Sequence, residues 1–180
     1  AEIKTLLACA KLLIDPNDHV SFVRVVNKLK IIKVDKKVLE GWKIESQLEN
    51  IHFSELILER KSLKYQELGK LYRFIKKGQE EFKFSSLRES FEDFLHNIGF
   101  FNILETEKNK ENRLENVEFF LKQIEQYEED GGSSFLHFIQ RIDQTFNLIQ
   151  HNNNVVNLMT IHASKGLEFK YVFFIGIEDG

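Results

Sequence analysis

The sequence contains one proline, nine glycines and one cysteine in 180 residues. All-β folds need more turn residues than this, so the shortage of proline and glycine, beside seventeen phenylalanines, favours a helical chain with aromatic packing. The single cysteine, Cys9, cannot form an internal disulfide, which fits a reducing cytoplasm, and no second cysteine is present to build a metal site. We therefore expect no bound metal, and we interpret Cys9 as a small buried residue between two alanines.

Long apolar runs are also absent. No stretch approaches the roughly 20 apolar residues of a transmembrane helix, and the first residues lack the apolar core of a signal peptide. The sequence therefore predicts a cytoplasmic protein with no membrane partner. Because it begins at Ala1 without a methionine and stops at Gly180 shortly after an expected strand, we interpret it as a piece of a larger polypeptide.

With a net charge of −3, the molecule as a whole does not attract nucleic acid. Any contact with nucleic acid would therefore come from a local cluster of positive charge. One such group, which we call the lysine cluster, consists of Lys28, Lys30, Lys33, Lys36 and Lys37. Only Asp35 opposes these five charges, and they are enough to contact several phosphates. A solvated lysine-rich face is the alternative interpretation, and the sequence leaves it open.

Apolar residues recur at helical spacing through the first part of the chain. They predict a helix over residues 3–14, which Pro16 stops. Asp18 is expected to cap a second helix that runs to Asn27. Over residues 34–53 the spacing is imperfect, and Trp42 is interpreted there as a core residue, with stacking on a nucleic-acid base as the alternative.

The pattern then predicts one long or two shorter helices over residues 54–77, ending near Gly78. Ser86 opens a capping box for a further helix, which Gly99 closes. A strong helix is expected to start near Arg113 and to end before two consecutive glycines. Ser133 or Ser134 is expected to cap a last helix, whose phenylalanines at helical spacing indicate core packing rather than nucleotide stacking.

The end of the chain combines two short apolar runs with a polar turn. Residues 155–159 and 171–175 are rich in β-branched and aromatic side chains, as are buried strands of a parallel sheet. The turn between them carries Thr160, His162, Ser164, Lys165, Gly166 and Glu168. In an open parallel sheet, ligands bind beyond the carboxyl ends of the strands, so this turn is the candidate functional site.

This stretch resembles motif V of the UvrD/PcrA/Rep-type superfamily 1A DNA helicases, V-x-L-M-T-x-H-x-x-K-G-L-E-F followed by a strand and G-x-E-x-G. The resemblance implies that Glu168 accepts hydrogen bonds from the nucleotide ribose. Thr160 and His162 would lie beside the single-stranded DNA backbone. Lys165 and Gly166 would shape the turn that couples the nucleotide cleft to the DNA groove.

Two further segments resemble the same family, at residues 2–27 and at 113–117. The resemblance therefore implies a mainly α fold, in which a helical 2B-like subdomain is flanked by a helix and two strands of a RecA-like α/β domain. Residues 1–27 would lead from RecA-like domain 2A into the insert and residues 28–153 would form the 2B-like subdomain. Residues 154–180 would form the motif V strand-turn-strand of domain 2A.

Within the insert the sequence departs from the family pattern. The family commonly continues with T-P-x-R-G-I-G, a hairpin between helices whose backbone contacts duplex DNA. Here residues 28–35 read Lys-Leu-Lys-Ile-Ile-Lys-Val-Asp, without those glycines. We hypothesise that the lysine cluster replaces the backbone contact with side-chain electrostatics.

The sequence lacks the parts that hydrolyse ATP. It contains no G-x-x-x-x-G-K-[ST] phosphate loop and no carboxylate pair for Mg²⁺, and the arginine finger of motif VI would lie beyond Gly180. We therefore expect no ATP or Mg²⁺ bound by this chain alone and no turnover. The resemblance implies that the full-length protein is a DNA helicase and DNA-dependent ATPase that uses ATP and Mg²⁺.

The resemblance implies single-stranded and forked DNA as partners, with repair or replication proteins as further candidates. Two alternatives stay open. The parent could be a helicase-nuclease subunit of the RecB or AddA kind, which shares motif V. The chain could also be a non-enzymatic helical module that binds a protein partner.

Overall fold

The structure is a computed structural model that describes residues 2–82, 84–142, 156, 158–160, 164 and 169–176. The chain divides into two compact units, residues 1–143 and residues 144–180, and each is described by itself.

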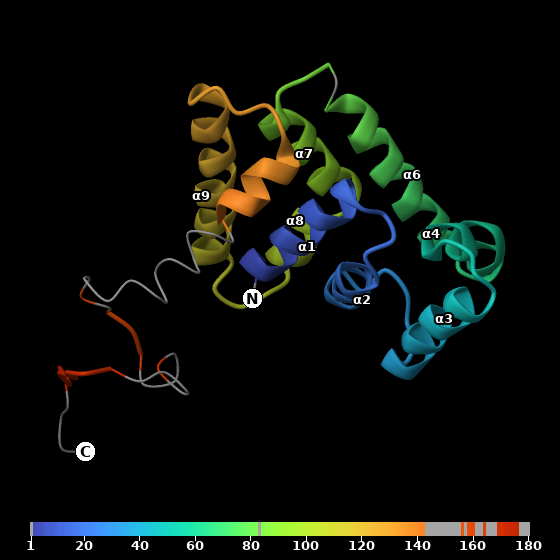
Figure 1. The fold of residues 1–180 in the computed structure, drawn as a ribbon, viewed down its shortest axis with the longest axis horizontal. Coiled ribbons are helices and arrows are strands. Elements are labelled where there is room, and N and C mark those ends of the chain that lie inside the picture. Colours follow the sequence, from blue (N-terminus) through green and yellow to red (C-terminus); the bar gives the residue numbers. More distant parts are fainter. Residues whose placement is uncertain are drawn as a thin grey trace. The chain divides into compact units, whose positions relative to one another are not determined.

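The first unit is helical throughout (Figure 1). Its elements are α1 (Glu2–Ile14), α2 (His19–Lys28), α3 (Lys36–Leu48), α4 (Phe53–Leu56), the π-helix η1 (Ile57–Lys61), α5 (Ser62–Lys64), α6 (Gln66–Glu81), α7 (Leu87–Asn97), α8 (Phe100–Glu105) and α9 (Lys110–Glu129). Residues 135–142 form another helix. The described residues contain no strand, so the prediction of a mainly α chain is confirmed for this part.

Helix α1 lies in the core of this unit and packs against α2, α6 and α9 (Figure 1). Leu6, Cys9 and Leu12 are fully buried on it. Complete burial of a leucine side chain contributes roughly 1.5–3 kcal/mol, so α1 is a principal source of the unit's stability. Burial also raises the pKa of the Cys9 thiol, which therefore stays protonated, as expected for a buried structural cysteine.

Three helix ends predicted from local signals are confirmed. The Asp18 carboxylate accepts hydrogen bonds from the Ser21 N–H at 3.1 Å and the Ser21 hydroxyl at 2.6 Å, which caps α2. Ser86 caps α7 by accepting from the Glu89 N–H at 3.1 Å. At the other end of α7, Gly99 has a φ of 72°, the left-handed conformation for which glycine is suited.

The aromatic residues interpreted as core are buried where the structure describes them. Phe91 lies 5.9 Å from Phe120 and 5.0 Å from Phe135, measured between ring centroids. Phe138 packs edge-on against Phe120, which joins α7, α9 and the helix at residues 135–142. Trp42 is only 7% exposed and packs against Tyr65, so its interpretation as a core residue is confirmed.

Two predictions about regular structure are wrong. Helix α6 continues past Gly78 to Glu81, because this glycine provides room for α1 instead of ending the helix. Residues 171–175 do not form a strand, and their side chains are exposed. A buried strand requires a neighbouring strand for its backbone hydrogen bonds, and the described part of the chain offers none.

For the other expected strand, Val156 and residues 158–159 are described and lie in no strand, whereas Val155 and Asn157 lie outside the described residues. The RecA-like and 2B-like boundaries stay predictions.

Candidate nucleic-acid interface

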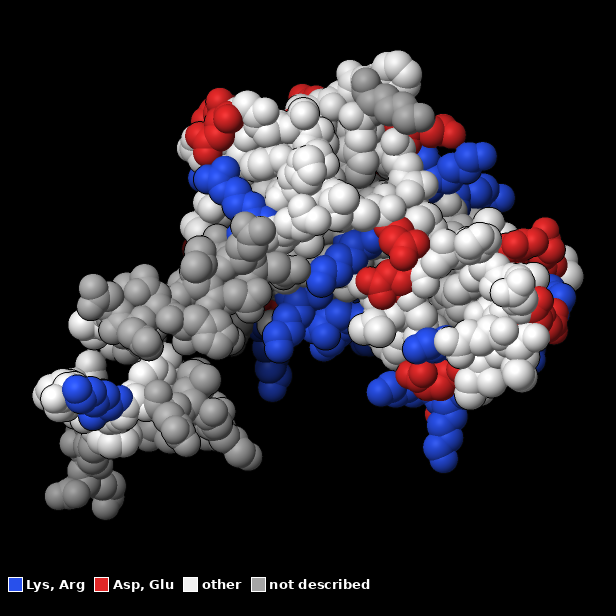
Figure 2. All heavy atoms as spheres, in the orientation of Figure 1, with Lys and Arg blue, Asp and Glu red and all other residues white. Residues whose placement is uncertain are grey.

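The lysine cluster spans the last residue of α2, the connection that follows it and the first two residues of α3. All five lysines are exposed, and none forms an ion pair with another residue that the structure describes. Figure 2 shows Lys and Arg side chains gathered over α2 and projecting at the start of α3. The ten residues 28–37 carry a net charge of +4 within a chain whose net charge is −3. The structure therefore places a locally positive surface here.

The backbone of this connection is held in place by alternating apolar residues. Leu29 is 7% exposed, and Ile31, Ile32 and Val34 are partly buried against the core. The lysines between them remain exposed. This alternation explains how a segment without the family's glycines can still present a fixed positive surface.

Hydrogen bonds fix the turn that follows α2. The Ile31 N–H donates to the Val26 carbonyl at 3.0 Å, and the Lys30 N–H donates to the Asn27 carbonyl at 3.4 Å. These two bonds define a Schellman motif, in which the residue at the turn takes a left-handed conformation. That residue is Lys30, with a φ of 51°.

Asp35, the one acidic residue between the lysines, is the N-terminal cap of α3. Its carboxylate accepts a hydrogen bond from the Lys37 N–H at 2.7 Å and so caps α3. A carboxylate in this position is stabilised by the N-terminal end of the helix dipole. Its side chain is therefore directed to the backbone of α3 rather than to a lysine ammonium.

Arg24 is a candidate that the sequence pattern did not single out. It lies one turn before Lys28 on α2, is half-buried, and its Nε is sealed from solvent without a hydrogen-bond partner in the described structure. Positions i and i+4 share one face of a helix, so the spacing of Arg24 and Lys28 was the available signal. Arg24 extends the positive surface along α2.

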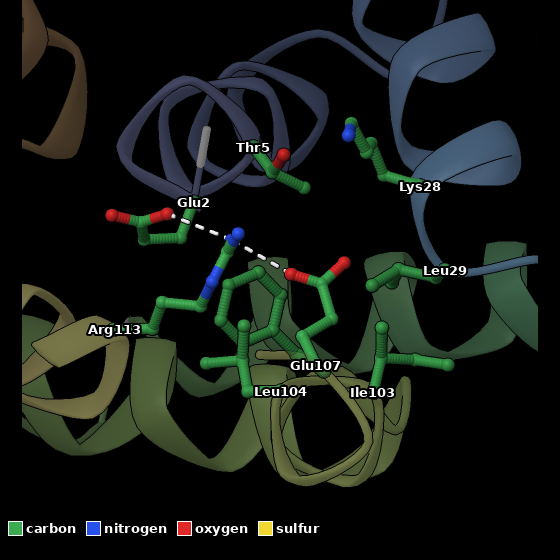
Figure 3. Close-up of a pocket in the computed structure, with 9 residues that line it drawn as sticks. Glu2, Thr5, Lys28, Leu29, Ile103, Leu104, Glu107 and Arg113 are labelled. Atoms are coloured by element: carbon green, nitrogen blue, oxygen red, sulfur yellow. Dashed lines mark hydrogen bonds and ion pairs between the residues drawn. The ribbon is translucent and has the colours of Figure 1, made fainter. Parts of the chain in front are cut away.

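A small cleft lies beside the cluster, and Lys28 forms part of its lining (Figure 3). Arg113 lies between two carboxylates there, 3.1 Å from Glu2 and 2.7 Å from Glu107. The Asn116 amide also donates to Glu2 at 2.8 Å. The pKa of Glu2 lies below its usual value, chiefly through its own backbone N–H, while burial opposes this effect and Asn116 adds to it.

The cleft cannot hold a nucleotide. Its volume of about 20 Å³ is enough for about one water molecule. In addition, no group of three or more His, Cys, Asp or Glu residues within the described ranges could hold a metal ion. This cleft is therefore too small for ATP.

Most of the predicted motif V site lies outside the described residues. This applies to His162, Lys165, Gly166 and Glu168. Thr160 is described and exposed, and its carbonyl accepts a hydrogen bond from the Ser164 N–H at 3.1 Å. The structure thus brings the lysine cluster together, whereas the nucleotide and strand contacts of the turn stay predictions.

Comparison with known proteins identifies the class. A family model described as the UvrD-like helicase C-terminal domain matches residues 1–180, and the chain belongs to this family. Among curated proteins, the chain is similar to the ATP-dependent DNA helicase PcrA of Staphylococcus aureus strain Mu50, with 29% identity over 191 residues. It is also similar to the probable DNA helicase II homolog of Rickettsia conorii, with 27% identity over 186 residues.

Both matches cover 99% of this chain but only 26% and 28% of the relatives. The chain therefore spans about a quarter of the length of the curated relatives it matches. No helix in the part that the structure describes is long and apolar enough to cross a membrane. The resemblance to UvrD-type helicases found in the motifs is confirmed at the level of the family.

Proposed function

We propose that this chain is part of the C-terminal motor region of an ATP-dependent DNA helicase that moves along single-stranded DNA. The observation that carries the proposal is the match of the whole chain to the UvrD-like helicase C-terminal domain. Relatives that match 99% of the chain are named as DNA helicases, which supports the same reaction class. In the complete protein, ATP hydrolysis would be stimulated by DNA, while this chain alone would hydrolyse none.

Within that protein, the motif V turn would couple nucleotide to DNA. We assign contact with the nucleotide ribose to Glu168 and contact with the DNA strand to Thr160 and His162. Lys165 and Gly166 would shape the turn. These assignments come from the match between the motif and residues 155–169, since the structure leaves most of the turn undescribed.

The test is ATP hydrolysis by the complete protein with and without single-stranded DNA. Glu168→Ala is expected to raise the KM for ATP, because it removes a ribose hydrogen bond. His162→Ala is expected to weaken stimulation by DNA. Glu115→Ala, at an exposed position on α9, serves as the control and is expected to leave both unchanged. An absence of DNA-dependent turnover in the unaltered protein would refute the helicase proposal and favour the helical interaction module.

The lysine cluster would contact the phosphate backbone of duplex DNA at a fork. Its exposure, its net charge of +4 and the engagement of Asp35 as a helix cap support this assignment. The measurement is binding of the 180-residue chain to forked DNA across a range of salt concentrations. Replacing Lys28, Lys33, Lys36 and Lys37 together by glutamine is expected to lower the affinity and to flatten the salt dependence by about 0.9 for each phosphate that a lysine no longer neutralises. Unchanged affinity and salt slope would refute a contribution of these four lysines, and they would refute the duplex contact itself if removing the Lys30 charge also left binding unchanged.

A further inference from the structure

Lys30 has an unfavourable backbone conformation. Its φ of 51° lies in the left-handed region, where the Cβ of an ordinary residue comes close to the following carbonyl. Three other helices are also followed by a residue with a left-handed backbone. These residues are Asn50 after α3, Gly99 after α7 and Gly131 after α9. Asparagine and glycine tolerate this conformation. Lysine gains at the end of α2 only the attraction of its charge to the helix dipole, which at an exposed position is smaller than the steric cost.

Stability of the turn does not explain the choice of lysine. The two hydrogen bonds of the Schellman motif are made by backbone groups, and the contacts with the core are made by Leu29, Ile31 and Ile32. A glycine at position 30 would keep all of these interactions and remove the steric conflict. The Lys30 side chain is exposed and forms no ion pair with another described residue. An unfavourable conformation that the fold does not require is a sign of a functional constraint.

Resting on the proposed duplex contact, we propose that Lys30 is a fixed phosphate-binding residue, whose ammonium meets the DNA backbone at the end of α2. The left-handed turn holds its Cα between the anchored Leu29 and Ile31, so the side chain starts from a defined point on the surface. Lys28 differs because it borders the cleft that contains Glu2 and Glu107, whose two negative charges are only partly balanced by Arg113 and so reduce the local positive potential. Lys30 therefore makes the larger contribution to phosphate binding of the two.

The experiment compares Lys30→Gly with Asn50→Gly, since both residues occupy the left-handed position of a Schellman motif. Binding of the 180-residue chain to fluorescent forked DNA is measured by anisotropy against salt, and thermal unfolding is measured in parallel. Lys30→Gly is expected to raise the Tm by roughly 2–4 °C, because the steric conflict is removed. It is also expected to lower the affinity roughly fivefold to tenfold near 0.1 M salt and to flatten the salt slope by about 0.9.

Asn50→Gly is expected to leave DNA binding unchanged. Lys30→Arg keeps the charge and is expected to retain most of the affinity, whereas Lys30→Asn fits the turn without the charge and should bind as weakly as the glycine variant. Lys122→Gln, an exposed lysine on α9, controls for net charge and should have no effect.

Two results would overturn the inference. One is unchanged DNA binding by Lys30→Gly while the quadruple glutamine variant binds more weakly, in which case the duplex contact stands without Lys30. The other is a Tm for Lys30→Gly at or below that of the unaltered chain, which would mean that the turn needs the lysine for folding. Unchanged binding by both variants would instead refute the proposed duplex contact itself.

Discussion

Gly78 lies inside α6, facing α1. A Cβ at this position would come 2.8 Å from Leu13 Cδ2, and Leu13 is only 2% exposed. The neighbouring Gln79 amide donates to the Leu13 carbonyl at 2.9 Å, so the two helices are also joined by a hydrogen bond. The absence of a side chain at Gly78 therefore permits the close approach of α6 to α1.

Gly78→Ala is expected to destabilise the chain, although alanine is the better helix former. Crowding in a packed core costs about 1–3 kcal/mol, which outweighs the roughly 1 kcal/mol gained in helix propensity. Gly41→Ala is the matched control, since Gly41 lies in α3 with no atom within 4 Å of its Cβ position. Gly41→Ala should stabilise the chain by about 0.8–1 kcal/mol, because alanine is the better helix former. Urea unfolding measures both, and equal stabilisation by the two changes would contradict the close packing.

Glu128 caps a helix to which it does not belong. From α9, its two carboxylate oxygens accept hydrogen bonds from the Leu87 and Arg88 N–H groups at the start of α7. Glu128→Ala is expected to cost about 1–2 kcal/mol, because it leaves two donors of the helix terminus without their acceptor. The adjacent exposed Glu129→Ala should change stability by less than about 0.5 kcal/mol in the same urea unfolding experiment. Equal effects of the two changes would argue against the cap.

At the scale of elements, ion pairs join α3 to η1. Arg60 lies 2.6 Å from Glu49, and Lys61 lies 2.6 Å from Glu45. The hydrogen bond from Arg60 lowers the pKa of Glu49 below its usual value. A π-helical segment of five residues, Ile57–Lys61, supplies both basic side chains.

The lowered pKa of Glu49 gives a pH dependence with a definite sign. The stabilising effect is present above about pH 4.5, the usual value for glutamate, and is lost as the pH falls through the lower folded-state pKa. Glu49→Gln should therefore lower the Tm slightly at pH 7, and this effect should shrink as the pH falls toward 3. Thermal unfolding of both chains from pH 3 to 7 measures this difference, and high salt should reduce it. A difference that grows toward low pH would contradict the assignment.

Elements whose boundaries depend on local signals could be predicted from the sequence. Asp18, Ser86 and Gly99 act on residues within one helical turn, and the structure places each at the expected helix end. The role of Gly78 depends on Leu13, which is distant in the sequence, so the same glycine signal was misleading there. The cap by Glu128 was missed for the same reason.

The candidate site was predictable in composition but not in conformation. The charge of residues 28–37 is visible in the sequence, and the structure confirms that the five lysines are exposed. The left-handed Lys30 could not be predicted, because lysine is an unusual residue at that turn and only its backbone hydrogen bonds reveal it. The buried Nε of Arg24 depends on packing that a single sequence does not contain.

At the scale of the whole helical unit, contacts between distant segments hold the beginning of α1 to α9. Arg113 bonds Glu2, 111 positions earlier, as well as Glu107. Arg113→Met keeps much of the side-chain volume and is expected to cost about 1–3 kcal/mol, since it removes charged hydrogen bonds at a partly buried position. Amide hydrogen exchange should then increase at the start of α1. Lys110→Met, at an exposed position, should change neither the stability nor the hydrogen exchange of α1. If both variants changed these quantities equally, Arg113 would act only through net charge.

Cys9 makes the chain suitable for site-specific labelling. It is the single cysteine of the sequence, it is fully buried, and its raised pKa leaves almost no reactive thiolate at neutral pH. A maleimide dye would therefore react with a cysteine introduced at an exposed position such as Lys33 and spare the native thiol. A fluorophore on the lysine cluster could then report the arrival of DNA without first removing Cys9 from the core.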